Sequence, residues 1–204
     1  WNYEKRLQYP VNIKTPNAKL AQFNPASMGG PDGEIGASMR YLSQRFTAPN
    51  RMVAAVLNDV GTEELAHLEI VSTIVHQLTK DLSMEEIENS GLGPYYIDHT
   101  VGIWPQAAGG VPLMPAIPDK GDPITDLFED LAAEQKARST YDNILRVVKN
   151  IPEVADPIRF LRAREVVISS VSVSTEIRAG QLDAKNFYAF NPSFDAPCKA
   201  SCEE

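Results

Sequence analysis

The alternation of apolar and polar positions predicts four long helices. From about residue 51 to 80, apolar residues return at spacings of three, four and seven: Val53, Leu57, Val60, Leu68, Val71, Val75 and Leu78. The same periodicity marks a helix from Asp122-Pro123 to about 149, through Leu127, Leu131, Tyr141, Leu145 and Val148. An acid beside a proline marks the start of the other two helices, one over about 32–47 after Pro31-Asp32 and one opening at Asp156-Pro157.

The segments between and around these helices are irregular. Prolines and a Gly29-Gly30-Pro31 break predict an extended arm over residues 1–30, and 181–204 form a tail. Residues 90–121 contain six glycines and five prolines, which indicates a long crossover. Four helices in two pairs, joined by one long connection, are typical of the ferritin-like four-helix bundle. We therefore expect one all-α domain over 1–204, with the bundle at 31–180.

Composition and charge exclude several classes of protein. The chain has 204 residues, of which 43% are apolar and 23% charged, as in ordinary globular domains. Its net charge of −8 disfavours nucleic-acid binding, and no apolar run reaches membrane-spanning length. The opening lacks an apolar signal-peptide core, so we expect no export by that route. Cys198 and Cys202 are interpreted as thiols of the tail.

The first functional signal is a pair of charged residues inside an apolar stripe, which is weak evidence by itself. Glu64 and His67 fall in the middle of the 51–80 stripe, one helical turn apart on the same face. A buried carboxylate without a partner costs several kcal/mol or loses its charge. A bound metal ion removes this cost, because it supplies the missing positive charge and accepts the lone pairs.

An internal repeat extends this signal to both helix pairs. Glu34 is followed seven residues later by Tyr41 and thirty residues later by Glu64; Glu134 is followed seven residues later by Tyr141 and thirty-one residues later by Glu165. Two single glutamates plus two Glu-x-x-His motifs form the carboxylate-bridged dimetal site of ferritin-like proteins. The repeat therefore requires a histidine three residues after Glu165, where the chain has Ile168.

Simpler interpretations remain open for each of these residues. Glu34 and Glu134 could be solvated, Glu165 could pair with Arg162 or Arg164, and Tyr41 and Tyr141 could be core aromatics. A further alternative is a surface ladder of Asp130, Glu134 and Arg138 at spacing four. We expect His76 at the surface and a structural role for His99.

The chain resembles a known family, the manganese catalases. The stretches that carry the resemblance are 29–34, 61–69, 120–124 and 132–138, and the opening Tyr3-Glu4-Lys5-Arg6-Leu7-Gln8-Tyr9-Pro10-Val11 resembles the short members found in spore coats of spore-forming bacteria. The resemblance runs from about residue 1 to 167 and resumes at about 182–195. It implies a dimanganese centre that converts hydrogen peroxide to water and oxygen.

The resemblance also implies roles for individual residues. Glu34 and His67 would bind the first manganese, Glu134 the second, and Glu64 would bridge both. Glu165 would manage protons as an outer-sphere catalytic carboxylate, and Tyr41 would hydrogen-bond Glu34. Two manganese ions suit these ligands, although the ligand set does not discriminate against iron.

The chain departs from the family pattern after residue 167. Family members usually continue His-Phe-Gln-Arg-Phe-Gly-Glu, whereas this chain reads Ile168-Ser169-Ser170-Val171-Ser172-Val173-Ser174, a poor helix former. Loss of one base from a segment coding for the family sequence yields Ile-Ser-Ser-Val-Ser-Val. We therefore hypothesise a local frameshift that is repaired before about Leu182, which resequencing codons 165–182 would test. With Ile168 in place, we expect a weak second metal site and low turnover.

Two rival functions remain beside the catalase. The first is a spore-coat structural or assembly protein that keeps the fold with little catalysis, and the second is a di-iron oxidase. The resemblance further implies a homo-oligomer, commonly a hexamer, located in the cytoplasm or the spore coat, with other coat proteins as possible partners.

Overall fold

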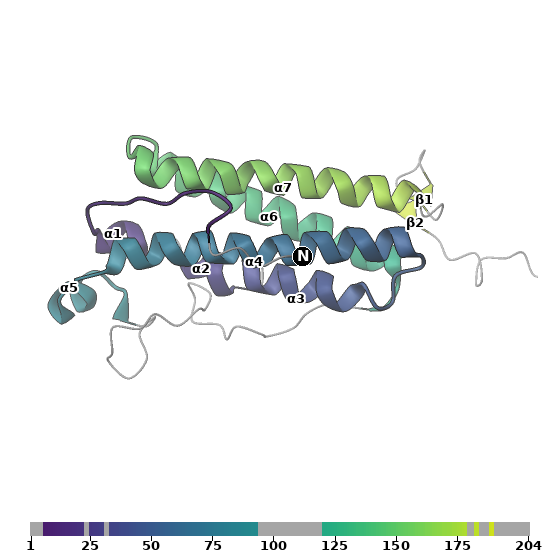
Figure 1. Ribbon diagram of the computed structural model, residues 1–204, viewed down its shortest axis with the longest axis horizontal. Coiled ribbons are helices and arrows are strands. Elements are labelled where there is room, and N and C mark those ends of the chain that lie inside the picture. Colours follow the sequence, from purple (N-terminus) through teal and green to yellow (C-terminus); the bar gives the residue numbers. More distant parts are fainter. Residues whose placement is uncertain are drawn as a thin grey trace, which may run out of the picture.

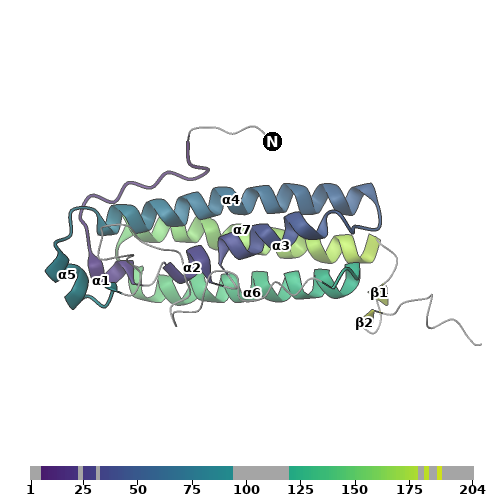
Figure 2. The same ribbon diagram turned by 90° about the horizontal axis from the view of Figure 1, so that it is seen from below.

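The computed structural model describes residues 6–22, 25–30, 33–93, 120–178, 182–183 and 188–189. Four long helices lie side by side as a bundle: α3 (Glu34–Gln44), α4 (Arg51–Thr79), α6 (Pro123–Val148) and α7 (Pro152–Arg178) (Figures 1 and 2). Shorter elements are α1 (Ala18–Ala21), α2 (Pro25–Gly29), α5 (Met84–Asn89) and the antiparallel pair β1 (Leu182–Asp183) and β2 (Tyr188–Ala189). The predicted all-α bundle is confirmed. None of the helices in the described ranges has the length and hydropathy needed to cross a bilayer.

Polar caps fix two of the helix starts that the sequence predicts. The Asn50 carboxamide accepts hydrogen bonds from the backbone N–H groups of Met52 and Val53, both at 3.0 Å, and starts α4. The Asp122 carboxylate does the same for α6, with Pro123 as the first helical residue. These caps satisfy amide groups that have no partner inside the helix.

The start of α7 differs from the prediction. This helix begins at Pro152, so Pro157 lies inside it instead of at its beginning. A proline inside a helix removes one backbone hydrogen bond. The turn before it is nevertheless held in the core, because Val154 and Ala155 are both fully buried.

The N-terminal arm is also not wholly extended, as α1 and α2 show. The Asn17 side chain caps α1 through Leu20 N at 3.1 Å, and the Asn17 N–H donates to the Leu78 carbonyl at 2.8 Å. Ala21 of α1 is fully buried. The arm is therefore anchored to the end of α4. Most of the predicted crossover, residues 94–119, lies outside the described residues.

Two clusters of apolar side chains form the core, and they lie at different heights of the bundle. The larger includes Ile70, Ile74 and Leu78 of α4 with Ile158 and Leu161 of α7. The smaller consists of Tyr41, Val53, Leu57, Val60, Leu127 and Ile168. On α4, Glu64 and His67 fall between these two clusters, so the polar residues occupy the middle of the bundle.

A close approach of α3 and α4 brings their functional side chains together. A Cβ atom at Gly61 would lie 2.8 Å from the Leu42 side chain and 3.2 Å from the Leu42 backbone nitrogen. The Ser38 hydroxyl also donates to the Gly61 carbonyl at 2.7 Å. Glycine at this position therefore allows the contact that places α3 beside Glu64.

The last part of α7 continues through a segment of low helix propensity. The β-branched and serine-rich residues after 167 lie within the helix, which ends at Arg178. Helix propensities of such residues differ from alanine by less than about 1 kcal/mol each, so tertiary packing can override them. Ile168 contributes to this packing, because it is 2% exposed.

Candidate metal centre

Four potential metal ligands converge in the middle of the bundle. Glu34 from α3, Glu64 and His67 from α4, and Glu165 from α7 each offer one ligand atom, and these atoms all lie within 4.8 Å of one another. All four side chains are at most 4% exposed. Carboxylate oxygens with one imidazole nitrogen are a donor set that manganese and iron accept.

The fifth predicted residue, Glu134 of α6, faces the same space. Glu134 is 2% exposed and lines a pocket together with Glu34, Glu64 and Glu165. The interpretation of Glu34 and Glu134 as solvated residues is therefore wrong.

Two tyrosines connect the helix pairs by hydrogen bonds to these glutamates. The Tyr41 hydroxyl donates to Glu134, and the Tyr141 hydroxyl donates to Glu34. The sequence predicts that Tyr41 bonds to Glu34. Instead, each tyrosine bonds to the glutamate of the other helix pair, so the partners are exchanged between the α3–α4 pair and the α6–α7 pair. Both tyrosines are 1% exposed, and their phenol groups orient one oxygen of each glutamate.

The charge balance of the pocket favours a bound cation. Burial raises the pKa of Glu34 well above its usual range, and the neighbouring Glu64 and Glu134 raise it further. Burial likewise raises the pKa of Glu165 strongly and that of Glu134 to about 7. Within the described part of the chain, Glu64 Oε1 and Glu134 Oε2 lack a hydrogen-bond partner. A divalent ion would satisfy these oxygens and stabilise their charged forms.

The His67 ring is held between the pocket and a supporting carboxylate. Its Nδ1 lies 3.0 Å from Glu64 Oε2 and 3.8 Å from Glu34 Oε2, whereas Nε2 lies 3.5 Å from Glu63 Oε1. Burial alone would lower the pKa of His67, but the charge of Glu64 and the contact with Glu63 raise it to about 9. Nδ1 is thus the atom that faces the metal ligands.

Glu63 is a functional residue that sequence reasoning missed. Arg164 of α7 donates to it with two nitrogens, at 2.6 and 2.9 Å, and Gln8 of the arm donates at 2.9 Å. Burial would raise the pKa of Glu63, but the contacts with His67, Arg164 and Gln8 lower it to about 2. Metal-binding histidines generally have such a carboxylate behind them. The sequence signal for this role of Glu63 is its position four residues before His67, one helical turn away.

Ile168 occupies the position where the repeat requires a second histidine. Its side chain belongs to the apolar cluster that contains Tyr41, Val60 and Leu127. A hydrocarbon offers no ligand atom, so the α6–α7 half presents carboxylates alone.

The remaining sequence interpretations have clear outcomes. Arg162 pairs with Asp142, and Arg164 pairs with Glu63. Arg138 also contacts Asp142, at 2.6 Å, while Asp130 and Glu134 are buried, so the surface ladder of these three residues does not form. His76 is exposed, as expected. His99, Cys198 and Cys202 lie outside the described residues.

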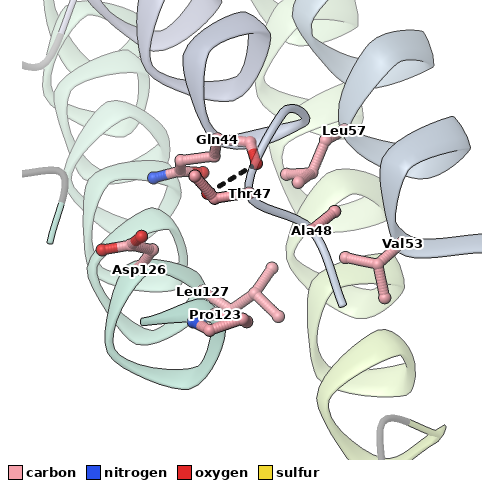
Figure 3. A pocket seen from close by; sticks show the side chains of 8 residues that line it. All are labelled: Gln44, Thr47, Ala48, Val53, Leu57, Pro123, Asp126 and Leu127. Carbon is pink, nitrogen blue, oxygen red and sulfur yellow. Dashed lines mark hydrogen bonds between the residues drawn. The ribbon is translucent and has the colours of Figure 1, made fainter. Parts of the chain in front are cut away.

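A second hollow lies near one end of the bundle, where α3 ends and α4 and α6 begin. It is lined by Gln44, Thr47, Ala48, Val53, Leu57, Pro123, Asp126 and Leu127 (Figure 3). Asp126 accepts hydrogen bonds there from the backbone N–H groups of Lys120 and Gly121. Its lining is mainly apolar, unlike the pocket that Glu34, Glu64, Glu134 and Glu165 line.

Known proteins are similar to this chain in sequence or in structure. Protein CotJC of Bacillus subtilis (strain 168) is 44% identical over 190 residues, which cover 92% of this chain and 100% of that protein. A probable manganese catalase of Clostridium acetobutylicum is 31% identical over 176 residues, 81% of this chain and 74% of that protein. The crystal structure of KatB, a manganese catalase from Anabaena, matches with a TM-score of 0.79 at 24% identity, covering 94% of this chain and 86% of that one.

The solved structure supports the ferritin-like fold. The profile of the family described as manganese containing catalase matches residues 1–172, which include every residue of the pocket. The chain therefore belongs to the manganese catalase family.

Proposed function

We propose that this protein binds manganese in the pocket between α3, α4, α6 and α7 and disproportionates hydrogen peroxide there. The observation that carries the proposal is the buried group of Glu34, Glu64, His67 and Glu165, with Glu134 lining the same pocket. Four carboxylates buried at one point favour a bound cation, because buried charges without a partner are costly.

The proposed reaction converts two hydrogen peroxide molecules into two water molecules and one oxygen molecule. One peroxide is oxidised and gives up two electrons and two protons; the other accepts them and its O–O bond breaks. Manganese, when bound, supplies the two-electron exchange. Glu34, Glu64, His67 and Glu134 would hold the metal, with Glu64 shared between two ions.

Glu165 would hold the proton between the two half-reactions. Burial and the neighbouring Glu34 and Glu134 carboxylates raise the pKa of Glu165, so its oxygen is suited to receive a proton from one peroxide and return it to the other. Glu165 is also close enough to the ligand group to contribute an oxygen ligand where the second histidine is missing.

Ile168 sets the expected limits of this activity. The second ion would be held by carboxylates alone, so we propose two manganese positions of unequal affinity. Loss of a nitrogen ligand predicts incomplete loading of the second position and reduced turnover.

Substitution of Glu165 tests the proposed reaction. In Glu165→Gln, oxygen release from peroxide should fall about a hundredfold relative to the wild type. The control is Glu153→Gln, which changes a carboxylate at the start of the same helix and should leave oxygen release unchanged. Equal activity in wild type and E165Q would contradict the role of Glu165, and no oxygen release from manganese-loaded wild type would contradict the function.

A second candidate is a coat protein that keeps the fold with little catalysis. Ile168 favours this candidate, and so do the opening sequence of spore-coat type and the 44% identity to CotJC. Under this proposal the chain would lie in the spore coat, assemble with copies of itself or other coat proteins, and release little oxygen even when manganese is supplied. Iron uptake with oxygen consumption in the absence of peroxide would instead indicate a di-iron oxidase.

A further inference from the structure

Arg40 of α3 is an unusual residue of the bundle interior. It is 3% exposed, and no other lysine or arginine whose burial the structure describes is buried. Its Nε and Nη1 atoms have no hydrogen-bond partner among the described residues. Because a buried cation with unpaired donors is costly, Arg40 requires an explanation.

The position of Arg40 relates it to the carboxylate pocket. Arg40 lines that pocket together with Glu34, Glu64, Glu134 and Glu165. The remaining lining residues are Gly33, Ala37, Ala133 and Ala137, all of which have small side chains. A small polar molecule in this space would therefore meet the donors of Arg40 on one side and the carboxylates on the other.

A purely structural role as a counter-ion explains Arg40 less well. The positive charge of Arg40 does act on its surroundings, because it lowers the pKa of both Asp130 and Glu134 against the larger effect of burial. Arg164, however, shows what a structural ion pair looks like in this protein: two nitrogens donate to Glu63 at 2.6 and 2.9 Å. Two nitrogens of Arg40 remain available for a ligand.

The charge count indicates the chemistry of that ligand. Two divalent cations would neutralise the four carboxylates of the pocket, and the positive charge of Arg40 would then remain. A site with that balance prefers a small neutral or anionic molecule with adjacent acceptor atoms. Hydrogen peroxide and its hydroperoxide anion have oxygens that accept a hydrogen bond from a guanidinium N–H group.

We propose that Arg40 binds the peroxide substrate, donating hydrogen bonds to it from the side of α3. The inference rests on the proposed function, because it assumes that peroxide enters the carboxylate pocket. It assigns to Arg40 the affinity for substrate, and leaves electron exchange to the metal and proton transfer to Glu165.

The test compares Arg40→Met, Arg40→Lys and the wild type, each loaded with manganese. Azide, a small anion with adjacent acceptor atoms, is the probe, and its dissociation constant is measured by calorimetry beside the KM and kcat for peroxide. In R40M both the azide dissociation constant and KM should rise about tenfold or more, since charge-assisted hydrogen bonds are lost. Manganese content should stay at the wild-type level, and R40K should recover part of both affinities.

The control is Arg45→Met, which removes the arginine at the C-terminal cap of α3, whose side chain binds Asn58 outside the pocket. This variant should match the wild type in azide affinity, KM and manganese content. Circular dichroism checks that each variant is folded.

The possible outcomes separate the two proposals. If the wild type disproportionates peroxide and R40M keeps wild-type azide affinity and KM, this inference is wrong and the proposed function stands. Loss of manganese from R40M, with R40K restoring metal and stability but not azide affinity, would also overturn it in favour of a structural role. If manganese-loaded wild type releases no oxygen, both proposals fail.

Discussion

The two helix pairs of the bundle present nearly the same layout, and they differ where the repeat predicts a second histidine. The α3–α4 half supplies Glu34, Glu64 and His67, whereas the α6–α7 half supplies Glu134, Glu165 and, in place of a second histidine, Ile168. The glutamates of both halves lie in one pocket. The glutamates therefore converge although the α6–α7 half has Ile168 at the position of the predicted histidine.

The contacts around each half explain how the glutamates converge without a second histidine. Each tyrosine of the repeat donates to a glutamate of the opposite half, Tyr41 to Glu134 and Tyr141 to Glu34. These bonds hold the carboxylates whether or not a histidine follows Glu165. His67 has its own support in Glu63 and Arg164, while Ile168 packs into an apolar cluster and stabilises the fold instead.

The largest expected effect comes from replacing the histidine of the α3–α4 half by isoleucine, the residue that the α6–α7 half has at the matching position. His67→Ile leaves the pocket with carboxylates only, and a manganese site without any nitrogen ligand should lose affinity by more than about a hundredfold. Elemental analysis after dialysis should find almost no manganese in this variant. His76→Asn, which changes an exposed histidine of the same helix, should retain the wild-type content.

Adding a histidine to the α6–α7 half should make the ligand sets of the two halves equal. Ile168→His supplies the missing nitrogen ligand, so we expect manganese content to rise toward two ions per chain and oxygen release to increase about tenfold or more. The control Ile168→Leu keeps an apolar side chain of the same volume and should change neither quantity. No gain of metal or activity in I168H would contradict the assignment of this position as a ligand site.

The tyrosine pair tests whether the halves support each other equally. Tyr41→Phe and Tyr141→Phe each remove one buried hydrogen bond to a carboxylate, so each should lower the free energy of unfolding by about 2 kcal/mol. Urea denaturation of the metal-free protein measures both values. A much larger loss for one variant would show that the exchanged bonds are not equivalent.

The smallest expected effect concerns a feature that only one half has. Asp130 lies one turn before Glu134 on α6, while the matching position before Glu34 is Gly30. Burial raises the pKa of Asp130 to about 7, against a hydrogen bond from Gln44 and the charge of Arg40. A raised pKa of an acid stabilises the fold at low pH, and that contribution is lost as pH rises through about 7.

Thermal unfolding of the metal-free protein between pH 5 and pH 8 measures this effect. Stability should fall with rising pH, with Asp130 contributing on the order of 1 to 2 kcal/mol. Glu134 and His67, whose pKa values are also raised, act in the same direction. Asp130→Asn should reduce the slope; an unchanged slope would mean that Asp130 is not the group responsible.

Much of the fold was predictable because the apolar periodicity is strong and the helix caps are explicit. The starts of α4 and α6 follow from Asn50 and from Asp122-Pro123. The beginning of α7 was not predictable, because it depends on the burial of Val154 and Ala155 rather than on local propensity. The short helix α5 was also missed, although Ser83 and Glu86 form a capping box at its start.

The carboxylates of the pocket were predictable from the repeat, because residues seven apart share a helix face. The exchange of tyrosine partners and the pairing of Glu63 with Arg164 were not, since they depend on how the helices cross. Arg40 gave no signal in the sequence, because a single arginine in a short amphipathic helix is ordinary until its burial is known.

The most direct test of the account is the manganese content per chain, measured by elemental analysis together with oxygen release from peroxide on the same sample. The account predicts at least about one manganese per chain, held by the half that carries His67, and oxygen release that stops when the metal is chelated. Protein grown with manganese that contains almost none, and that releases no oxygen, would contradict it.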